Sequence, residues 1–248
     1  MTLELHAFEV APDGRKLVSA VDLTLEAGTV TAVLGANGAG KSELVLAMAG
    51  MLPVNSGQML LDGQNLTGKG PDAIRAAGIA AVPEGHRVLT RLTVDDNLRA
   101  AGSLLTEGLE ITLAGTYELF PELAERKKQA AGTMSGGQQQ MLALGHALMC
   151  RPRFMLIDEM SLGLAPLVVK RLMGFVTGLK ESGVGVLLIE QFTDMALAVS
   201  EQAIVLRGGT VRYSGRAQNL SANKALLDEA YFGSDTVKAG ALITHEGE

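Results

Sequence analysis

Short apolar runs rich in Val, Ile and Leu alternate along the chain with longer stretches of helical spacing. Helices cover both faces of a parallel sheet, so its strands appear as continuous apolar runs rather than alternating ones. Buried strands of this kind are predicted at 29–34, 78–82, 154–157 and 185–189. Shorter strands are predicted at 59–62, 203–206 and 210–213. The pattern predicts an α/β protein with a mostly parallel sheet.

Helical spacing, with apolar residues three and four positions apart, recurs in five stretches. They lie at 42–51, 93–105, 117–129, 137–149 and 167–182. The three helices within 93–149 have no strand between them, which indicates a helical insertion in the α/β core. Arg207, Gly208 and Gly209 separate the last two short strands, as in a hairpin. We expect the polar residues after Gly233 to be loosely ordered.

Composition excludes several classes of protein. The 248 residues are 47% hydrophobic and 19% charged, which suffices for a sizeable core and excludes a disordered chain. The net charge is −6 and the aromatic residues are three Tyr and six Phe, so we expect no nucleic-acid partner. No apolar run approaches the roughly 20 residues that cross a bilayer. The single cysteine, Cys150, excludes an internal disulfide.

The predicted strand at 29–34 leads into a glycine-rich loop that opens a helix. The loop residues are Gly35, Ala36, Asn37, Gly38, Ala39, Gly40, Lys41 and Ser42, which match the pattern G-x-x-x-x-G-K-[ST]. Its glycines let the backbone wrap around phosphate oxygens, so that N–H groups and the helix N-terminus face the anion. Lys41 can reach the β- and γ-phosphates, and Ser42 offers a hydroxyl to Mg²⁺. This motif, called the phosphate loop below, predicts nucleotide binding.

Two acids, Asp158 and Glu159, follow the apolar strand at 154–157. Ligands of open α/β sheets bind at the carboxyl edge of the strands. We expect Asp158 to hold Mg²⁺ through water and Glu159 to orient or deprotonate a water molecule. Taken alone, such a pair fits a helix N-terminus equally well. The phosphate loop upstream favours the catalytic interpretation.

A second glycine motif, called the signature below, precedes the helix predicted at 137–149. It consists of Ser135, Gly136, Gly137 and Gln138. A helix N-terminus of this kind is a second anion site, yet one ATP has only one triphosphate. The signature therefore suggests a nucleotide site completed on another subunit. The same residues also fit a capping box between Ser135 and Gln138, and their spacing does not reject that alternative.

Together these motifs resemble the ABC-type ATPases over about residues 3–233. The ordered set is the phosphate loop, Val82-Pro83-Glu84, the signature, 154–159, 161–165 and 188–191. The resemblance implies a P-loop NTPase with a RecA-like core, an antiparallel β extension and an inserted helical subdomain. It implies one ABC ATPase domain at 1–233, with core and extension at 1–84 and 151–233, helical subdomain at 85–150 and polar tail at 234–248.

The resemblance also implies a head-to-tail dimer, formed with itself or with a second ABC ATPase subunit. Each of two ATPs would lie between the phosphate loop of one subunit and the signature of the other, which acts in trans. Residues 161–165 occupy the position of the loop that crosses the dimer interface. The implied cofactors are ATP and Mg²⁺. The implied catalytic residues are Glu159, Gln191 and Lys41, and the implied metal ligands are Ser42, Asp158 and Glu84.

Some positions depart from the family pattern. Glu84 stands where most ABC ATPases have Gln, and we expect it on the metal side of the nucleotide; a solvated loop acid is the alternative. Gln191 stands where most have His, so it would sense the γ-phosphate through its amide without becoming cationic. The aromatic residue that stacks on adenine has no counterpart at 10–14, and Phe8 is the nearest ring.

One branch of the family is especially similar. Val82-Pro83-Glu84-Gly85, Leu92-Thr93-Val94, 161–166 and Glu190-Gln191 resemble an ATPase subunit of the bacterial branched-chain amino acid importer. That implies an ATP-hydrolysing peripheral protein at the cytoplasmic face of the inner membrane, which drives transport by dimer closure. Its partners would be membrane permease subunits and, indirectly, a periplasmic or extracellular solute-binding protein. Importers of urea, amides or other amino acids, and soluble ABC ATPases without a transport role, are the alternatives.

Overall fold

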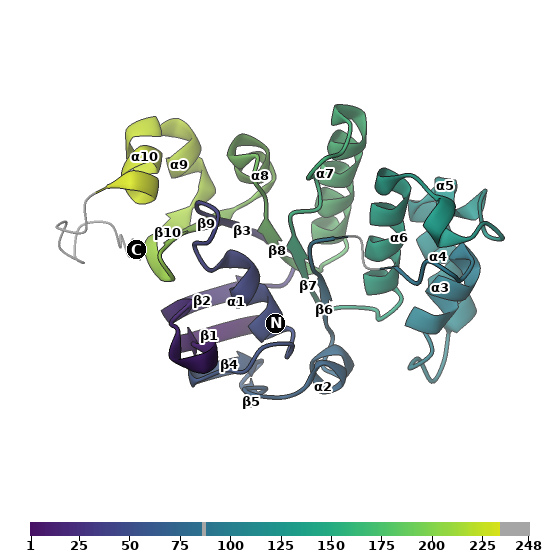
Figure 1. Ribbon diagram of the computed structural model, residues 1–248, viewed down its shortest axis with the longest axis horizontal. Coiled ribbons are helices and arrows are strands. Elements are labelled where there is room, and N and C mark those ends of the chain that lie inside the picture. The colour runs from purple at the N-terminus through teal and green to yellow at the C-terminus, as the bar shows by residue number, and fades with distance from the viewer. Residues whose placement is uncertain (86–87, 234–248) are drawn as a thin grey trace.

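The computed structural model of the chain describes residues 1–85 and 88–233, and the polar tail expected at 234–248 lies outside them. Two sheets are present within the described residues. A four-stranded antiparallel sheet has the order β2-β1-β4-β5, and a six-stranded sheet has the order β10-β9-β3-β8-β7-β6. Figure 1 shows the two sheets side by side at the left and centre, with a group of helices at the right. The expected α/β fold with an antiparallel β extension is confirmed.

The antiparallel sheet contains three strands that the apolar pattern did not predict: the long strands β1 and β2 and the two-residue strand β5. Its members are β1 (Thr2–Val10), β2 (Val18–Glu26), β4 (Ser56–Leu61) and β5 (Gln64–Asn65). Ala7 and Ala20 have φ of +46° and +48°, and the pairing of β1 with β2 shifts register between Leu5 and Phe8. Such bulges break the two-residue alternation by which a half-buried strand is recognised.

The six-stranded sheet confirms the buried strands expected from the continuous apolar runs. Its members are β3 (Val30–Leu34), β6 (Ile79–Val82), β7 (Phe154–Asp158), β8 (Gly185–Ile189), β9 (Gln202–Arg207) and β10 (Thr210–Arg216). Every residue of β3, β7 and β8 is buried. Strand β10 pairs antiparallel with β9, as the hairpin signal predicted, and the other five strands are parallel.

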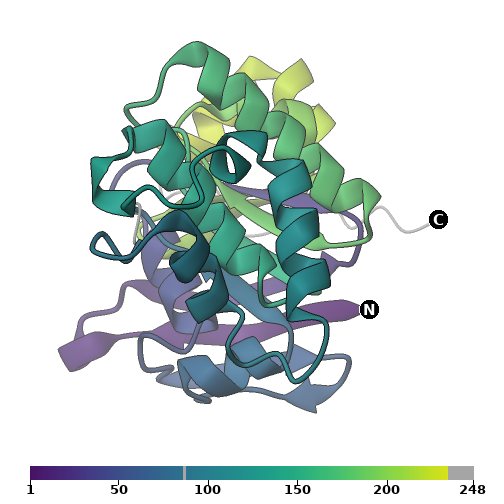
Figure 2. The same cartoon turned by 90° about the vertical axis from the view of Figure 1, so that its right-hand side faces the viewer.

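Ten α-helices surround the sheets within the described residues. They are α1 (Lys41–Met48), α2 (Pro71–Ala76), α3 (Val94–Ala101), α4 (Leu109–Leu119), α5 (Pro121–Ala124), α6 (Gly136–Leu148), α7 (Pro166–Glu181), α8 (Thr193–Val199), α9 (Ala217–Ala222) and α10 (Lys224–Phe232). Short 3₁₀ turns occur at Pro12–Gly14 and Ala131–Thr133. Helix α1 shares one apolar core with both sheets, and α3, α6 and α7 share a second core with the six-stranded sheet. Figure 2 shows α3 to α6 layered in front of the sheets.

The helix predicted at 117–129 is wrong. Helix α4 ends at Leu119, and α5 begins at Pro121. Proline lacks an N–H donor and disfavours helical backbone at the residue before it, and Phe120 accordingly has φ −126° and ψ 74°. The Phe120 ring packs instead against Phe175 of α7, with ring centroids 5.1 Å apart. This break therefore connects the inserted helices to the core.

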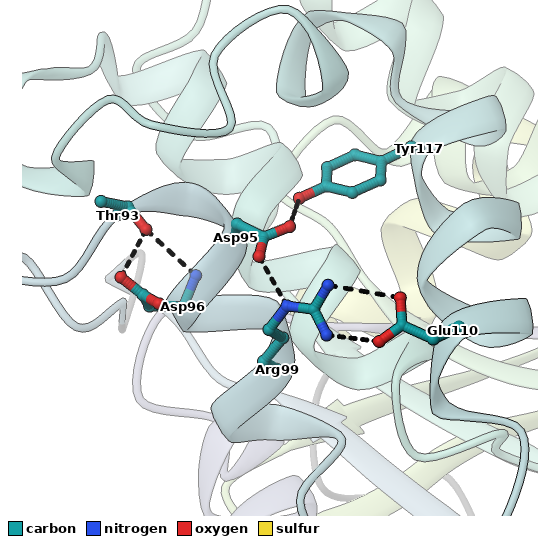
Figure 3. A network of polar contacts seen from close by, with 6 residues as sticks. All are labelled: Thr93, Asp95, Asp96, Arg99, Glu110 and Tyr117. Atoms are coloured by element: carbon teal, nitrogen blue, oxygen red, sulfur yellow. Dashed lines mark hydrogen bonds and ion pairs between the residues drawn. The ribbon is translucent and has the colours of Figure 1, made fainter.

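A polar network holds α3 against α4 (Figure 3). Arg99 of α3 binds Asp95 one turn earlier, with Nε to Oδ2 at 2.6 Å, and reaches across to Glu110 of α4. The Tyr117 hydroxyl donates to the second Asp95 oxygen at 2.7 Å. Although partial burial acts in the opposite direction, the hydrogen bonds from Tyr117 and Arg99 lower the pKa of Asp95. Thr93 caps the start of α3 by accepting from the Asp96 N–H.

A fully buried side chain, Asn97, fixes the loop that leads into α3. Its amide donates to the Leu89 and Thr93 carbonyls at 3.0 and 2.8 Å, and its Oδ1 accepts the Leu89 N–H at 2.8 Å. His146 Nε2 of α6 lies 3.1 Å from the same oxygen. Burial lowers the pKa of His146 to about 4, and the nearby Arg75 charge acts in the same direction. The imidazole is therefore neutral at neutral pH.

This environment predicts an acid sensitivity that depends on His146. The unfolded chain takes up a proton near pH 6.5, whereas the folded chain takes it up only near pH 4, so stability falls as pH drops through this window. Between pH 7 and pH 5 the wild type should lose about 2 kcal/mol more unfolding free energy than His146→Gln. Urea unfolding of both proteins across this range measures the difference. Parallel pH profiles would contradict the assignment.

Candidate functional site

The order of strands brings the predicted site residues to one edge of the six-stranded sheet. Strands β3, β8, β7 and β6 are neighbours and run parallel. Their carboxyl ends lead into the phosphate loop, Gln191, Glu159 and Glu84 respectively. Four segments that are distant in sequence therefore begin side by side, where ligands of α/β sheets bind.

The phosphate loop has the backbone that its glycines predict. Gly35, Gly38 and Gly40 all have positive φ, at 146°, 76° and 100°. A Cβ on Gly35 would lie 2.2 Å from the Leu206 carbonyl oxygen, and one on Gly40 would lie 2.3 Å from that of Leu17. Packing therefore excludes a side chain at these two positions, whereas Gly38 faces open space and is required only for its conformation.

Lys41 lies across this loop with its ammonium held by backbone carbonyls. Its Nζ donates to the Gly35 oxygen at 3.0 Å and to the Ala36 oxygen at 3.2 Å, and the residue is 5% exposed. Ala36, Asn37 and Gly38 are exposed. The loop therefore presents its backbone to solvent, with a positive charge underneath, which suits an oxyanion.

Asp158, the last residue of β7, is a buried acid. It is 2% exposed, and its Oδ1 has no hydrogen-bond partner within the part of the chain that the structure describes. Burial is the largest of the effects that raise the pKa of Asp158 to about 6, and the negative charges of Glu159 and Glu84 act in the same direction. A hydrogen bond with Ser42 and the positive charge of Lys41 act in the opposite direction. These interactions bring together all the residues expected around Mg²⁺.

Glu159 follows directly, on an unusual backbone. Its φ is +45°, in the left-handed region that costs a residue with a side chain on the order of 1 kcal/mol. Its N–H donates to the Ile189 oxygen of β8 at 3.0 Å. Backbone strain of this kind is often found at catalytic positions. Glu84, at the end of the next strand, is exposed.

The loop after β8 contains a further buried acid, Glu190, directly before the exposed Gln191. Burial raises the pKa of Glu190 to about 7, against the effect of a hydrogen bond from Ser161. The sequence drew attention to Glu190 only as part of a family motif. Its partner is 29 residues away in the chain, so no local pattern signalled the pairing.

The signature lies away from the phosphate loop of the same chain. Ser135 caps α6, and the capping box with Gln138 is formed: the Ser135 N–H donates to Gln138 Oε1 at 3.0 Å. Helix α6 packs on the far side of the sheet from α1, against α3, α4 and α5 (Figure 1). The local capping interpretation is therefore confirmed, and the role in trans stays a prediction.

Two aromatic residues near the site serve the fold. Phe8 is fully buried in the core between the sheets, so its ring cannot stack on adenine. Tyr231 of α10, which the sequence did not indicate, accepts the Gly35 N–H at 3.2 Å and lies 3.1 Å from the Thr193 hydroxyl. Tyr231 thus anchors the start of the phosphate loop.

Comparison with known proteins agrees with this geometry. The ABC transporter family matches residues 18–161. The high-affinity branched-chain amino acid transport ATP-binding protein BraG of Pseudomonas aeruginosa is 41% identical over 215 residues, 86% of this chain and 91% of that protein. A probable branched-chain amino acid transport ATP-binding protein, LivF of Archaeoglobus fulgidus, is 35% identical over 202 residues, 81% of this chain and 86% of that one.

Solved structures show the same fold. A nucleotide-free ATP-binding cassette from an ABC transporter superposes with a TM-score of 0.82 at 24% identity, covering 92% of this chain and 98% of that chain. The family match spans more than half of the chain, from β2 to the segment after Glu159. The P-loop NTPase fold expected from the motifs is thereby confirmed. The chain belongs to the ABC transporter family.

Proposed function

We propose that this chain binds and hydrolyses ATP as the motor subunit of an importer of branched-chain amino acids. The observation that supports this most is the cluster of Lys41, Ser42, Asp158 and Glu159 at one sheet edge, beside a backbone cradle for phosphate. Both relatives described above carry names for branched-chain amino acid transport. The solute itself would be selected by other subunits of the importer.

The residues present fit a magnesium ion. Asp158 offers a buried oxygen without a partner, and the neighbouring groups are the Ser42 hydroxyl and the Glu84 carboxyl, all hard oxygen donors. A nearby cation would offset the burial and the acidic neighbours that raise the pKa of Asp158. We propose that these three residues hold Mg²⁺, which would neutralise charge on the phosphates of ATP.

The other groups would then divide the work of hydrolysis. Glu159 would accept a proton from the attacking water, and Lys41 would leave the loop carbonyls to bind the β- and γ-phosphates. The side-chain amide of Gln191 would donate a hydrogen bond to a γ-phosphate oxygen. Phosphate oxygens would also accept hydrogen bonds from the backbone N–H groups of residues 35–42. Base stacking by Phe8 is absent from this scheme because that ring is buried.

A dimer would complete the site. The signature residues 135–138 lie at an exposed helix N-terminus, away from the phosphate loop of the same chain. A head-to-tail partner, either a second copy or another ABC ATPase, would bring its signature to the nucleotide. Three exposed apolar residues would be covered by such a partner: Leu162 and Phe192 on the loops after β7 and β8, and Leu167 in the first turn of α7.

The membrane partner would dock on a groove between the core and the inserted helices. The groove has a volume of about 400 Å³, and α2, β6, α3 and α6 contribute to its walls. Leu89 and Met51 line it and are 49% and 46% exposed. Among the described residues, no helix is long and apolar enough to span a bilayer. We propose a peripheral location at the cytoplasmic face of the membrane, with permease subunits as partners.

We propose that the chain divides into a core with β extension at 1–84 and 151–233 and a helical subdomain at 85–150. The helices α3 to α6 follow one another between β6 and β7 and pack together, which supports this division. The groove at the junction would let the permease sense the orientation of one part relative to the other.

Substitution of Glu159 tests the catalytic role. Glu159→Gln should keep the ATP dissociation constant of the wild type and lower turnover by at least about 100-fold, since the amide cannot accept the proton of the attacking water. Glu181→Gln, an exposed acid at the end of α7, is the matched control and should leave both quantities unchanged. Equilibrium ATP binding and steady-state phosphate release measure them. Full turnover by Glu159→Gln would remove Glu159 from this role.

A charge in the groove tests the docking surface. Leu89→Asp should greatly reduce co-purification with the membrane permease subunits because it places a carboxylate against an apolar contact. ATP affinity of the isolated chain should not change. Ile111→Asp, at an apolar residue that is 77% exposed but outside the groove, is the control. Equal losses for the two variants would contradict docking at this groove.

A further inference from the structure

One buried carboxylate near the nucleotide site has no part in the scheme above. Glu190 is 2% exposed and accepts a hydrogen bond at Oε2 from the hydroxyl of Ser161, which is itself 1% exposed. Its Oε1 has no partner of ordinary hydrogen-bond geometry among the described residues. The backbone N–H groups of Ser161 and Gln191 nevertheless lie near enough to lower its pKa. A fully buried acid placed in this way requires an explanation.

The pair joins two loops that belong to different strands. Ser161 lies two residues after Glu159 in the loop that leaves β7, and Glu190 is the last residue before Gln191 in the loop that leaves β8. Near the same point, the Glu159 N–H donates to the Ile189 oxygen at the end of β8, at 3.0 Å. The side-chain pair therefore continues the contact of β7 with β8 beyond the end of the sheet.

The contrast in burial shows why such a link matters. Ser161 and Glu190 are buried, whereas Leu162 is 43% exposed and Gln191 and Phe192 are also exposed. Each loop thus has an anchored first part and a free second part. Removal of either side chain would leave the other one buried without its hydrogen bond. Because a buried polar group without a partner costs free energy, the loop after β7 would be expected to move. Glu159 would move with it, since its backbone is already in a strained region.

We propose that Glu190 is a positioning residue that, through Ser161, holds the catalytic Glu159 and the phosphate-sensing Gln191 in one fixed geometry. This inference rests on the proposed ATP hydrolysis. Glu190 is not itself placed in contact with the nucleotide. It acts by fixing the loop after β7 to the loop after β8, so that Glu159 and Gln191 are both positioned at the same γ-phosphate.

Four variants of the full-length chain test the pair. Ser161→Ala removes the donor, Glu190→Ala removes the acceptor, and the double variant removes both. Glu190→Gln is conservative because its amide oxygen can still accept the Ser161 hydroxyl proton. Ser182→Ala, which deletes a hydroxyl bonded to the Leu179 carbonyl at the end of α7, is the matched control. Steady-state hydrolysis of ATP with Mg²⁺, equilibrium ATP binding and thermal unfolding are measured for each.

If Glu159 and Gln191 are misplaced, kcat should fall while KM and ATP affinity stay close to those of the wild type. Ser161→Ala and Glu190→Ala should each lower kcat roughly 10- to 100-fold, with KM and the ATP dissociation constant within about twofold of the wild type. The double variant should lose little more than either single variant, because one interaction is removed in all three. Glu190→Gln should restore most of the turnover, and Ser182→Ala should match the wild type.

The alternatives give different results. A wild-type kcat in both Ser161→Ala and Glu190→Ala would overturn the inference while leaving the proposed hydrolysis intact. Losses of ATP binding that equal the losses of turnover, or additive losses in the double variant, would overturn it as well. If Glu190→Ala does not fold, Ser161→Ala and Glu190→Gln decide alone. Absence of hydrolysis by the wild type would instead refute the proposed function, and the inference with it.

Discussion

The parallel pairing of four neighbouring strands sets the position of every group at the site. Strands β3, β8, β7 and β6 are hydrogen-bonded in that order, and their carboxyl ends form one continuous edge. The phosphate loop, Gln191, Glu159 and Glu84 each follow a different one of these strands. Because the strands are buried in two apolar cores, the spacing of these loops is fixed by packing rather than by their own sequences.

That edge concentrates negative charge where water is excluded. Asp158 and Glu190 are both nearly inaccessible, Glu159 raises the pKa of each, and both have a carboxyl oxygen with no hydrogen-bond partner in the described part of the chain. The two acids are accommodated differently. Ser161 satisfies the second oxygen of Glu190, whereas Asp158 faces Ser42 and Lys41 and so has the surroundings of a cation ligand.

The sequence predicts those parts of the site whose residues are neighbours in the chain. The phosphate loop and the acids after 154–157 were recognised because close approach to phosphate requires glycines and because ligand sites require polar groups at strand ends. Strands β1 and β2 were missed because bulges at Ala7 and Ala20 interrupt their alternation. The helix predicted at 117–129 does not form as one element because Pro121 excludes helical backbone at Phe120. The pairing of Ser161 with Glu190 exists only in three dimensions, so no spacing could reveal it.

The central claim is that Asp158 is buried without a partner because it faces the metal of a bound magnesium nucleotide. Calorimetric titration of ATP with and without Mg²⁺, on the wild type and on Asp158→Asn, tests this claim most directly. The account predicts that Mg²⁺ strengthens ATP binding to the wild type and that most of this gain disappears in Asp158→Asn, which still binds metal-free ATP. An equal gain from Mg²⁺ in both proteins would contradict it.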